Sequence, residues 1–138
     1  MPLSAELMSA YSNAVYVVFG EPEFVIRVGE PNAELDALLE TEGAASAAYV
    51  TAANPRGERR SREENAAAHE RLKSLLRDKR MGFRDGEGRD PKGFWTPEPS
   101  VLAVGIGRGD AESLCRTLEQ NAFVFIEKGG APELVILA

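Results

Sequence analysis

The run of residues from Ala45 to Ala53, ASAAYVTAA, constrains the fold of this chain more than any other segment. It contains no charged residue, and small side chains dominate it. Such a continuous run suits a central strand of a sheet whose two faces are both covered. The run ends at Asn54-Pro55, where proline removes a backbone donor that a sheet ladder needs. We therefore expect a buried central strand that leads directly into a loop.

β-rich segments near both ends of the chain indicate hairpins. Glycine and proline residues separate the two members of each pair, as is typical of tight turns. The pairs are Ala14–Phe19 with Glu23–Val28, and Ala122–Lys128 with Glu133–Leu137. Because a parallel pair needs a long crossover connection, two hairpins favour antiparallel pairing.

Helical patterns alternate with these strands. They cover Leu3–Tyr11, a short segment between the capping residues Asn32 and Gly43, Ser61–Arg80 and Asp110–Glu119. Ser100–Ile106 is expected to be a buried strand, and Met81–Trp95 to start as a strand and continue as a long loop. The order predicts one α+β domain over residues 1–138, with a mixed, largely antiparallel sheet and three to four helices packed on it.

Composition removes several classes of protein from consideration. Hydrophobic residues make up 43% and charged residues 28% of the chain, which is ordinary for a globular domain. No apolar run approaches the roughly 18 residues of a membrane-spanning helix, and Glu6 stands where a signal peptide carries a basic residue. A single cysteine, Cys115, fits a reducing cytoplasm. A single histidine, His69, excludes a multi-histidine metal centre, and we expect no metal and no cofactor.

The charges are distributed unevenly along the chain. Residues 1–50 carry one basic and eight acidic groups, a net of −7; residues 51–98 carry twelve and nine, a net of +3; residues 99–138 carry three and five, a net of −2. These values sum to the formal net charge of −6. Duplex DNA binding needs a strong positive field, so it is not expected. A local basic patch remains, centred on residues 51–65.

The basic patch coincides with the passage from the central strand to the longest helix, TAANPRGERRSREEN. Its arginines are Arg56, Arg59, Arg60 and Arg62. Free amides and the helix dipole favour an anion at a helix N-terminus, so these side chains could hold a phosphate or a carboxylate. They could equally form a solvated loop that pairs with neighbouring acidic residues. The sequence leaves both readings open.

Two residues at the start of this helix admit a structural explanation. Ser61 and Glu64 have the spacing of a capping box, in which each side chain bonds the other residue's backbone amide. Asn65 falls on the core-facing stripe, where a buried amide must find partners. It either bonds the loop backbone near Asn54-Pro55 or lines a pocket at the end of the strand.

Further polar residues stand just before the strands expected at Ser100–Ile106 and Ala122–Lys128. Pro97 and Pro99 stiffen the chain around Glu98, which is expected to pair with an arginine of the basic patch, either in a site or as a structural ion pair. Gln120 follows the last helix and could project into the same region. Asn121 is expected to be its left-handed C-cap residue.

Many of these residues form a succession that resembles a known family. The residues that carry the resemblance are Thr51-Ala52, Asn54-Pro55, Ser61, Glu64-Asn65, Leu72, Trp95, Glu98-Pro99-Ser100, Gln120-Asn121-Ala122 and Leu134-Val135. They resemble a family of small bacterial proteins known as domain of unknown function 3293, over nearly the whole chain. The resemblance implies a stand-alone bacterial domain without an assigned activity. The chain departs from the pattern at Ala53, where a bulkier, often aromatic residue is expected.

The motif residues are mostly polar and fall at strand ends and helix starts, which would suit one shared site. The sequence therefore predicts a domain that binds a small anionic ligand, with a nucleotide-like molecule as one candidate, around residues 51–65. The expected ligand-binding residues are Asn54, Arg56, Arg59, Asn65, Glu98, Ser100 and Gln120. If the domain is an enzyme, Glu64 or Glu98 is the candidate general acid or base.

The alternative is a non-catalytic interaction or regulatory module. Its acidic first third and basic middle would then dock on a protein partner or on a second copy of the chain. Convergence of the polar residues around one hollow would favour a ligand site, and their scattering into separate caps and turns would favour the interaction module.

Overall fold

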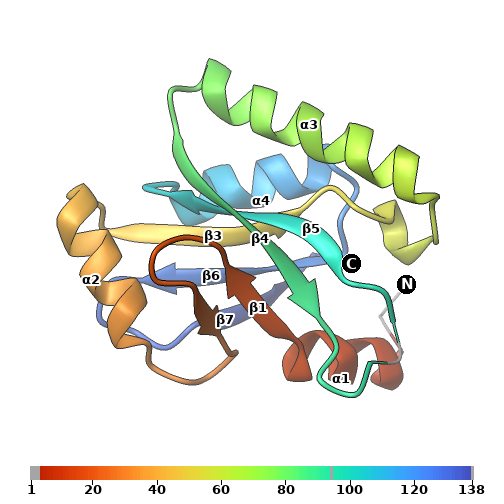
Figure 1. The fold of residues 1–138 in the computed structure, drawn as a ribbon, viewed down its shortest axis with the longest axis horizontal. Helices are drawn as coiled ribbons and strands as arrows, with labels where there is room; N and C mark the ends of the chain where they lie inside the picture. Colours follow the sequence, from red (N-terminus) through yellow and green to blue (C-terminus); the bar gives the residue numbers. More distant parts are fainter. Residues whose placement is uncertain (1–3, 94, 138) are drawn as a thin grey trace.

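The computed structural model describes residues 4–93 and 95–137 (Figure 1). Leu3, at the start of the first predicted helix, and Phe94, in the predicted loop, lie outside the described residues. The helices are α1 (Ala5–Asn13), α2 (Ala33–Glu42), α3 (Arg62–Asp78) and α4 (Arg108–Thr117), with a 3-10 turn, η1 (Pro55–Gly57). The strands are β1 (Val15–Val18), β2 (Phe24–Ile26), β3 (Ser46–Thr51), β4 (Gly82–Arg89), β5 (Glu98–Val104), β6 (Ala122–Glu127) and β7 (Glu133–Ile136).

The described strands form one curled sheet, a half-barrel, in the order β2-β1-β4-β5-β3-β6-β7. Every neighbouring pair in it is antiparallel. The predicted α+β class and the two terminal hairpins are therefore confirmed. The sheet has no parallel component within the described ranges, where the sequence prediction had allowed a mixed one.

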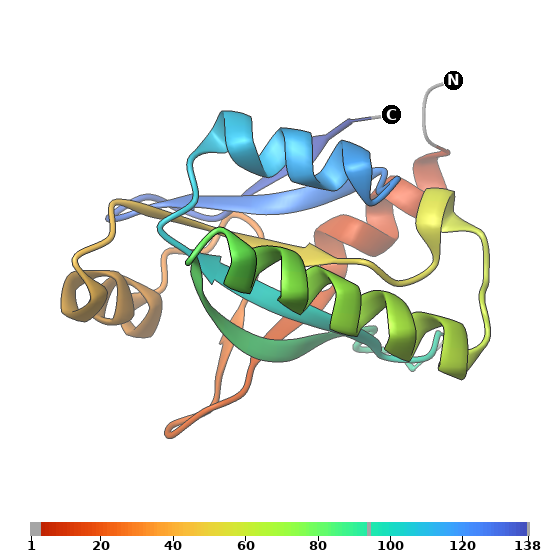
Figure 2. The same cartoon turned by 90° about the horizontal axis from the view of Figure 1, so that it is seen from above.

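Helices cover both faces of the sheet. α3 and α4 lie side by side on one face, where Leu72, Leu76 and Leu114 pack against the strands (Figure 2). α2 packs on the opposite face through Leu35 and Leu39. α1 and α2 lie near opposite ends of the molecule (Figure 1). No helix in the described ranges is long and apolar enough to cross a membrane.

β3 is the central strand that the alanine-rich run predicts. It pairs with β5 on one side and with β6 on the other. Ala48 and Val50 point toward α3 and α4, whereas Ala47 and Tyr49 belong to the core on the α2 face. Because alternate side chains of a strand point to opposite faces, a strand buried on both faces reads as a continuous apolar run.

The prediction for Met81–Trp95 is wrong in part, because the strand that begins there continues through eight residues to Arg89. Its sequence, GFRDGEGR, is rich in residues that are rare in strands. β4 is nevertheless bonded on both sides, to β1 and to β5, over its length. The ladders with these two neighbours outweigh the low strand propensity.

The helix ends follow the predicted capping chemistry in most places. Ser61 and Glu64 form the capping box at the start of α3. The prediction for Asn121 is wrong, because the left-handed residue after α4 is Glu119, with φ 57°. The amides of Glu119 and Gln120 bond the carbonyls of Arg116 and Cys115, as in a Schellman motif, so α4 ends at Thr117, four residues before Asn121.

Candidate functional site

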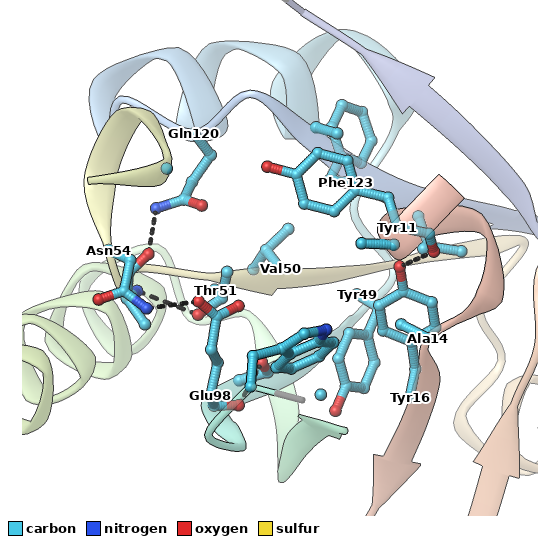
Figure 3. Close-up of a pocket in the computed structure, with 18 of the residues that line it drawn as sticks. Tyr11, Ala14, Tyr16, Tyr49, Val50, Thr51, Asn54, Glu98, Gln120 and Phe123 are labelled. Atoms are coloured by element: carbon cyan, nitrogen blue, oxygen red, sulfur yellow. Dashed lines mark hydrogen bonds between the residues drawn. The ribbon is translucent and has the colours of Figure 1, made fainter. Parts of the chain in front are cut away.

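A cavity of about 370 Å³ lies on the α2 face of the sheet, at the end where β3 leads into the loop of residues 52–61. Figure 3 shows this hollow and the side chains that surround it. Its wall combines residues of α1, β1, β3 and β5 with the segments at 53–59, 95–98 and 120–124. The size suits a small organic molecule, since typical ligand pockets occupy about 300–1,000 Å³.

Aromatic side chains form much of this wall. The lining includes Tyr11 from α1, Tyr16 from β1, Tyr49 from β3, Trp95 and Phe123. The rings of Tyr16 and Tyr49 meet edge to face, with their centroids 5.2 Å apart. Burial raises the pKa of all three tyrosines above the usual value of 10.0, so their hydroxyl groups stay neutral. The wall therefore presents uncharged, flat surfaces.

Two hydroxyl groups of this wall are bonded to backbone carbonyls. Tyr16 Oη donates to the Tyr11 carbonyl oxygen at 2.5 Å, which ties β1 to the end of α1. Tyr49 Oη donates to the Val17 carbonyl oxygen at 2.7 Å. These bonds fix the rings, and they leave the ring faces rather than the hydroxyl groups of Tyr16 and Tyr49 to contact a ligand.

Small residues create the space between the rings. Gly86 pairs with Val18 and Ser100, and Gly88 pairs with Tyr16 and Glu98, so both glycines face the same side as the cavity wall. A Cβ atom at Gly86 would lie 2.0 Å from the Val17 carbonyl oxygen. Tyr49 can cross β4 only because this position has no side chain.

Asn54 and Glu98 form the polar end of the cavity (Figure 3). Asn54 Nδ2 donates to Glu98 Oε2 at 2.6 Å. Asn54 Oδ1 accepts from the Arg60 amide and from Asn65 Nδ2, each at 2.9 Å. Asn65 Oδ1 in turn accepts from the Asn54 amide at 2.9 Å. Asn54 has a left-handed backbone, φ 47°, which asparagine tolerates better than most residues.

The Glu98 carboxyl group is largely removed from water. Burial raises its pKa above the usual 4.5, and the hydrogen bond from Asn54 offsets part of that rise. The expected arginine partner is not there, since in the described structure Glu98 pairs with the neutral Asn54 amide. A buried carboxylate without a cation is held only by hydrogen bonds, and it is correspondingly easy to protonate.

Gln120 also lies at the polar end, where Figure 3 shows it and Glu98 on either side of Asn54. Its Nε2 donates to the Ala53 carbonyl oxygen at 3.1 Å. Ala53 also lines the cavity, and a bulkier residue at that position would occupy part of the hollow. Two hydroxyl groups nearby are bonded to backbone: Thr51 Oγ1 donates to the Pro99 carbonyl oxygen at 2.7 Å, and Ser100 Oγ to that of Glu98 at 3.0 Å.

Comparison with known proteins assigns the family. Residues 50–123 match the model of a family described as "Protein of unknown function (DUF3293)". This segment is more than half of the 138-residue chain. The chain belongs to the DUF3293 family. No curated protein and no solved structure matches it. In this DUF3293 member the matched segment contains the polar end of the cavity, whereas α1 and β1, which supply Tyr11 and Tyr16, lie before it.

The fold of this chain brings together five of the seven residues predicted to bind a ligand. Asn54, Arg59, Glu98, Ser100 and Gln120 all line the cavity. These five residues share one hollow, although they come from segments up to 66 positions apart (residue 54 to residue 120).

Three other candidates lie outside the cavity lining. Arg56 is exposed and forms an ion pair with Glu119 on the surface. Asn65 lies behind Asn54 and bonds its amide and side chain, which is the structural alternative that the sequence allowed. Glu64 is exposed and belongs to the capping box, where the bonds from Ser61 lower its pKa.

The sequence reasoning missed the aromatic wall of this DUF3293 site. Tyr11, Tyr16 and Tyr49 carry no motif, and a tyrosine in a strand is ordinary. The available signal was the pair Gly86 and Gly88 at alternate positions, since glycine inside a strand often marks a close approach of another group. Among the described residues, no cluster of three or more histidine, cysteine, aspartate or glutamate side chains is placed to hold a metal ion.

Proposed function

We propose that this DUF3293 member binds a small organic molecule in the cavity. The flat part of the ligand would lie among the tyrosine rings, and an anionic group of the same ligand would lie at Arg59. A nucleotide-like molecule, with a planar base and a phosphate, is one candidate. The observation that carries the proposal is the convergence of Asn54, Glu98, Ser100 and Gln120 on one partly enclosed hollow of about 370 Å³.

Arg59 is the arginine of the basic patch that lines the cavity. Arg56 pairs with Glu119 and Arg60 pairs with Glu58. Arg59 lines the cavity, has an exposed side chain and makes no ion pair with any described residue. A guanidinium group held at the rim can bond a phosphate or carboxylate through two parallel N–H donors. The interior is uncharged apart from Glu98, so this proposal puts the anion at the rim and not inside.

The surface gives less support to the alternative of an interaction module. The large hydrophobic side chains exposed in the described structure are Met8 on α1, Phe19 after β1 and Leu75 on α3. They belong to three separate elements, and single exposed apolar residues are normal for a monomeric domain. Four polar residues of the motif, by contrast, line the cavity together: Asn54, Glu98, Ser100 and Gln120.

The test is a binding screen with a blocked cavity as control. Nucleosides, nucleoside monophosphates and aromatic acids and amines are screened by thermal shift and by NMR of backbone amides. A ligand at about 100 times its Kd adds about 2.7 kcal/mol to the free energy of unfolding. Ala10→Trp fills the hollow from α1, whereas Ala5→Trp changes an exposed alanine of the same helix that does not line it.

A ligand of the cavity should bind the wild type and Ala5→Trp alike and lose its affinity for Ala10→Trp. Equal binding by both tryptophan variants would place the ligand elsewhere and overturn the proposal. Failure of every compound to perturb amides around Tyr49 and Glu98 would overturn it as well.

A further inference from the structure

We propose that the polar end of the cavity recognises a group that donates N–H hydrogen bonds, such as an ammonium, an amidine or an amino-substituted ring. Glu98 and Gln120 would accept these bonds. This inference rests on the proposed function and specifies the chemistry of the ligand's buried end. It differs from the expectation that the sequence raises, which is an anion at this position.

The orientation of the Asn54 amide is set by the fold. Its Oδ1 accepts from two N–H donors, the Arg60 amide and Asn65 Nδ2. Its Nδ2 must therefore be the atom that faces Glu98, where the distance to Oε2 is 2.6 Å. Glu98 Oε2 is consequently an acceptor toward Asn54, and Oε1 is the carboxyl oxygen left for a ligand.

The orientation of the Gln120 amide is set in the same way. Nε2 lies 3.1 Å from the Ala53 carbonyl oxygen, which can only accept. The amide nitrogen is therefore committed to the backbone, and Oε1 is the atom that Gln120 has left to offer. Two acceptors, one carboxylate and one amide, thus remain at the polar end.

Four hydroxyl groups around the cavity already donate within the protein. Thr51, Ser100, Tyr16 and Tyr49 each donate their hydroxyl hydrogen to a backbone carbonyl. The other side-chain donors of the lining are Tyr11, Arg59, Trp95, Thr96 and the second N–H of Asn54 Nδ2. An anion between Glu98 and Gln120 would face a carboxylate and an amide oxygen, whereas an N–H group would satisfy both.

The rings beside the polar end fit the same kind of ligand. The faces of tyrosine rings attract cations and stack on planar groups. An N–H group held at Glu98 and an anionic group at Arg59 would suit a ligand with opposite charges at its two ends. Either an alkylammonium or an amino-substituted heterocycle meets this requirement, and the probes below distinguish them.

Glu98→Gln inverts the hydrogen-bonding polarity at almost constant shape. Because Asn54 Nδ2 still needs an acceptor, the carbonyl oxygen of the introduced side-chain amide would take the place of Oε2. The NH₂ group of that amide would then take the place of Oε1 and point into the cavity. The probes are benzamidine, which donates two N–H bonds, and benzoate, which accepts them on the same ring.

Calorimetric titration should give benzamidine about tenfold or more tighter binding than benzoate in the wild type, as expected for a hydrogen bond to a charged group. Glu98→Gln should lose about tenfold or more of the benzamidine affinity. Benzylamine and 2-aminobenzimidazole then compare an ammonium with a planar amino group at the same site. A preference of the wild type for benzoate, or unchanged benzamidine binding by Glu98→Gln, would overturn the inference.

A pH titration of the wild type provides a second measurement that needs no variant. Benzamidine stays cationic between about pH 4 and about pH 8, and its affinity should rise as Glu98 ionises. The other titratable or charged groups of the lining are the arginine Arg59 and the tyrosines Tyr11, Tyr16 and Tyr49. Burial raises the pKa of all three tyrosines above the usual 10.0, so they stay neutral in this range. An affinity that is flat with pH would contradict the role of Glu98.

Ala10→Trp separates the two levels of the proposal. If either probe binds the wild type and is lost in Ala10→Trp, the cavity is a binding site and the proposed function stands. A benzoate-selective cavity would then overturn only the donor-group inference. Binding of both probes that is insensitive to Ala10→Trp would instead overturn the proposed function.

Discussion

Gly86 lies so close to Tyr49 that no side chain fits between them. A Cβ atom at residue 86 would lie 2.8 Å from the Tyr49 hydroxyl oxygen and 2.0 Å from the Val17 carbonyl oxygen. The hydroxyl donates to that same carbonyl at 2.7 Å. Tyr49 is thus anchored beyond the two strands next to its own, across β5 and β4, and its ring becomes a fixed part of the cavity wall.

Gly86→Ala should therefore lower the free energy of unfolding by about 3 kcal/mol, because the added methyl group forces β4 away from β1 and displaces Tyr49. Urea denaturation measures this loss. Gly82→Ala is the matched control in the same strand, since a Cβ atom there meets nothing within 4 Å. A loss for Gly86→Ala no larger than for Gly82→Ala would mean that the strand relaxes without cost.

Asn65→Ala should cost about 1–3 kcal/mol of stability, because it leaves the Asn54 amide without its acceptor and the Asn54 side chain without one donor. Asn13→Ala, which changes an exposed asparagine at the end of α1, should have an effect below about 0.5 kcal/mol. Equal midpoints for the two variants in denaturant would remove the structural role that we assign to Asn65.

Glu98→Gln should stabilise the protein more at neutral than at acidic pH. Burial raises the pKa of Glu98 above 4.5 in the folded state, so between these two pKa values the folded chain binds more protons than the unfolded chain. The contribution of Glu98 to stability therefore falls as pH rises through that interval. Glutamine does not titrate and avoids this loss.

The measurement is the difference in Tm between Glu98→Gln and the wild type across the pH range. It should grow as pH rises through the interval and then become constant. Glu30→Gln, in the exposed loop before α2, is the control for loss of one acidic group. A difference that does not vary with pH would show that ionisation of Glu98 is not coupled to folding.

Arg59→Ala should weaken an anionic ligand of the cavity about tenfold and leave its uncharged analogue unaffected, because a charge-assisted hydrogen bond is worth about 1.5–3 kcal/mol. Arg62→Ala removes the same charge from a residue of α3 that does not line the cavity. Isothermal titration with a nucleoside and its monophosphate compares the two variants. An identical decrease for both variants would indicate a general electrostatic effect rather than contact.

The elements that the sequence identified most clearly are those with local causes. The capping box of Ser61 and Glu64 forms within four residues. The continuous run of small and apolar residues in β3 is enough to predict that both faces of this strand are buried. β4 was predicted only in part, because its glycines and charges gain strand structure from β1 and β5, which lie elsewhere in the chain. The sequence of β4 itself does not indicate which distant strands it pairs with.

In the candidate site, too, the residues with a local sequence signal could be predicted and the tertiary contacts could not. Asn54, Glu98 and Gln120 stood out because polar residues at strand ends and helix starts are conspicuous against apolar runs. The sequence could not tell that Asn54 and not an arginine bonds Glu98, since that depends on a left-handed turn at Asn54 that aims its amide. The aromatic wall depends on α1 folding against β1, β3 and the loop at Trp95, which is a purely tertiary event.

α1 supplies Leu7, Ala10 and Tyr11 to the wall, yet none of its residues is fully buried. A helix without a fully buried side chain should separate from its neighbours at a smaller free energy than the sheet does. The hollow can then exchange its contents with solvent by a local opening, while β3 and β5 keep their ladder. Hydrogen–deuterium exchange should be faster in the amides of α1 than in those of β3, and a bound molecule should slow it there first.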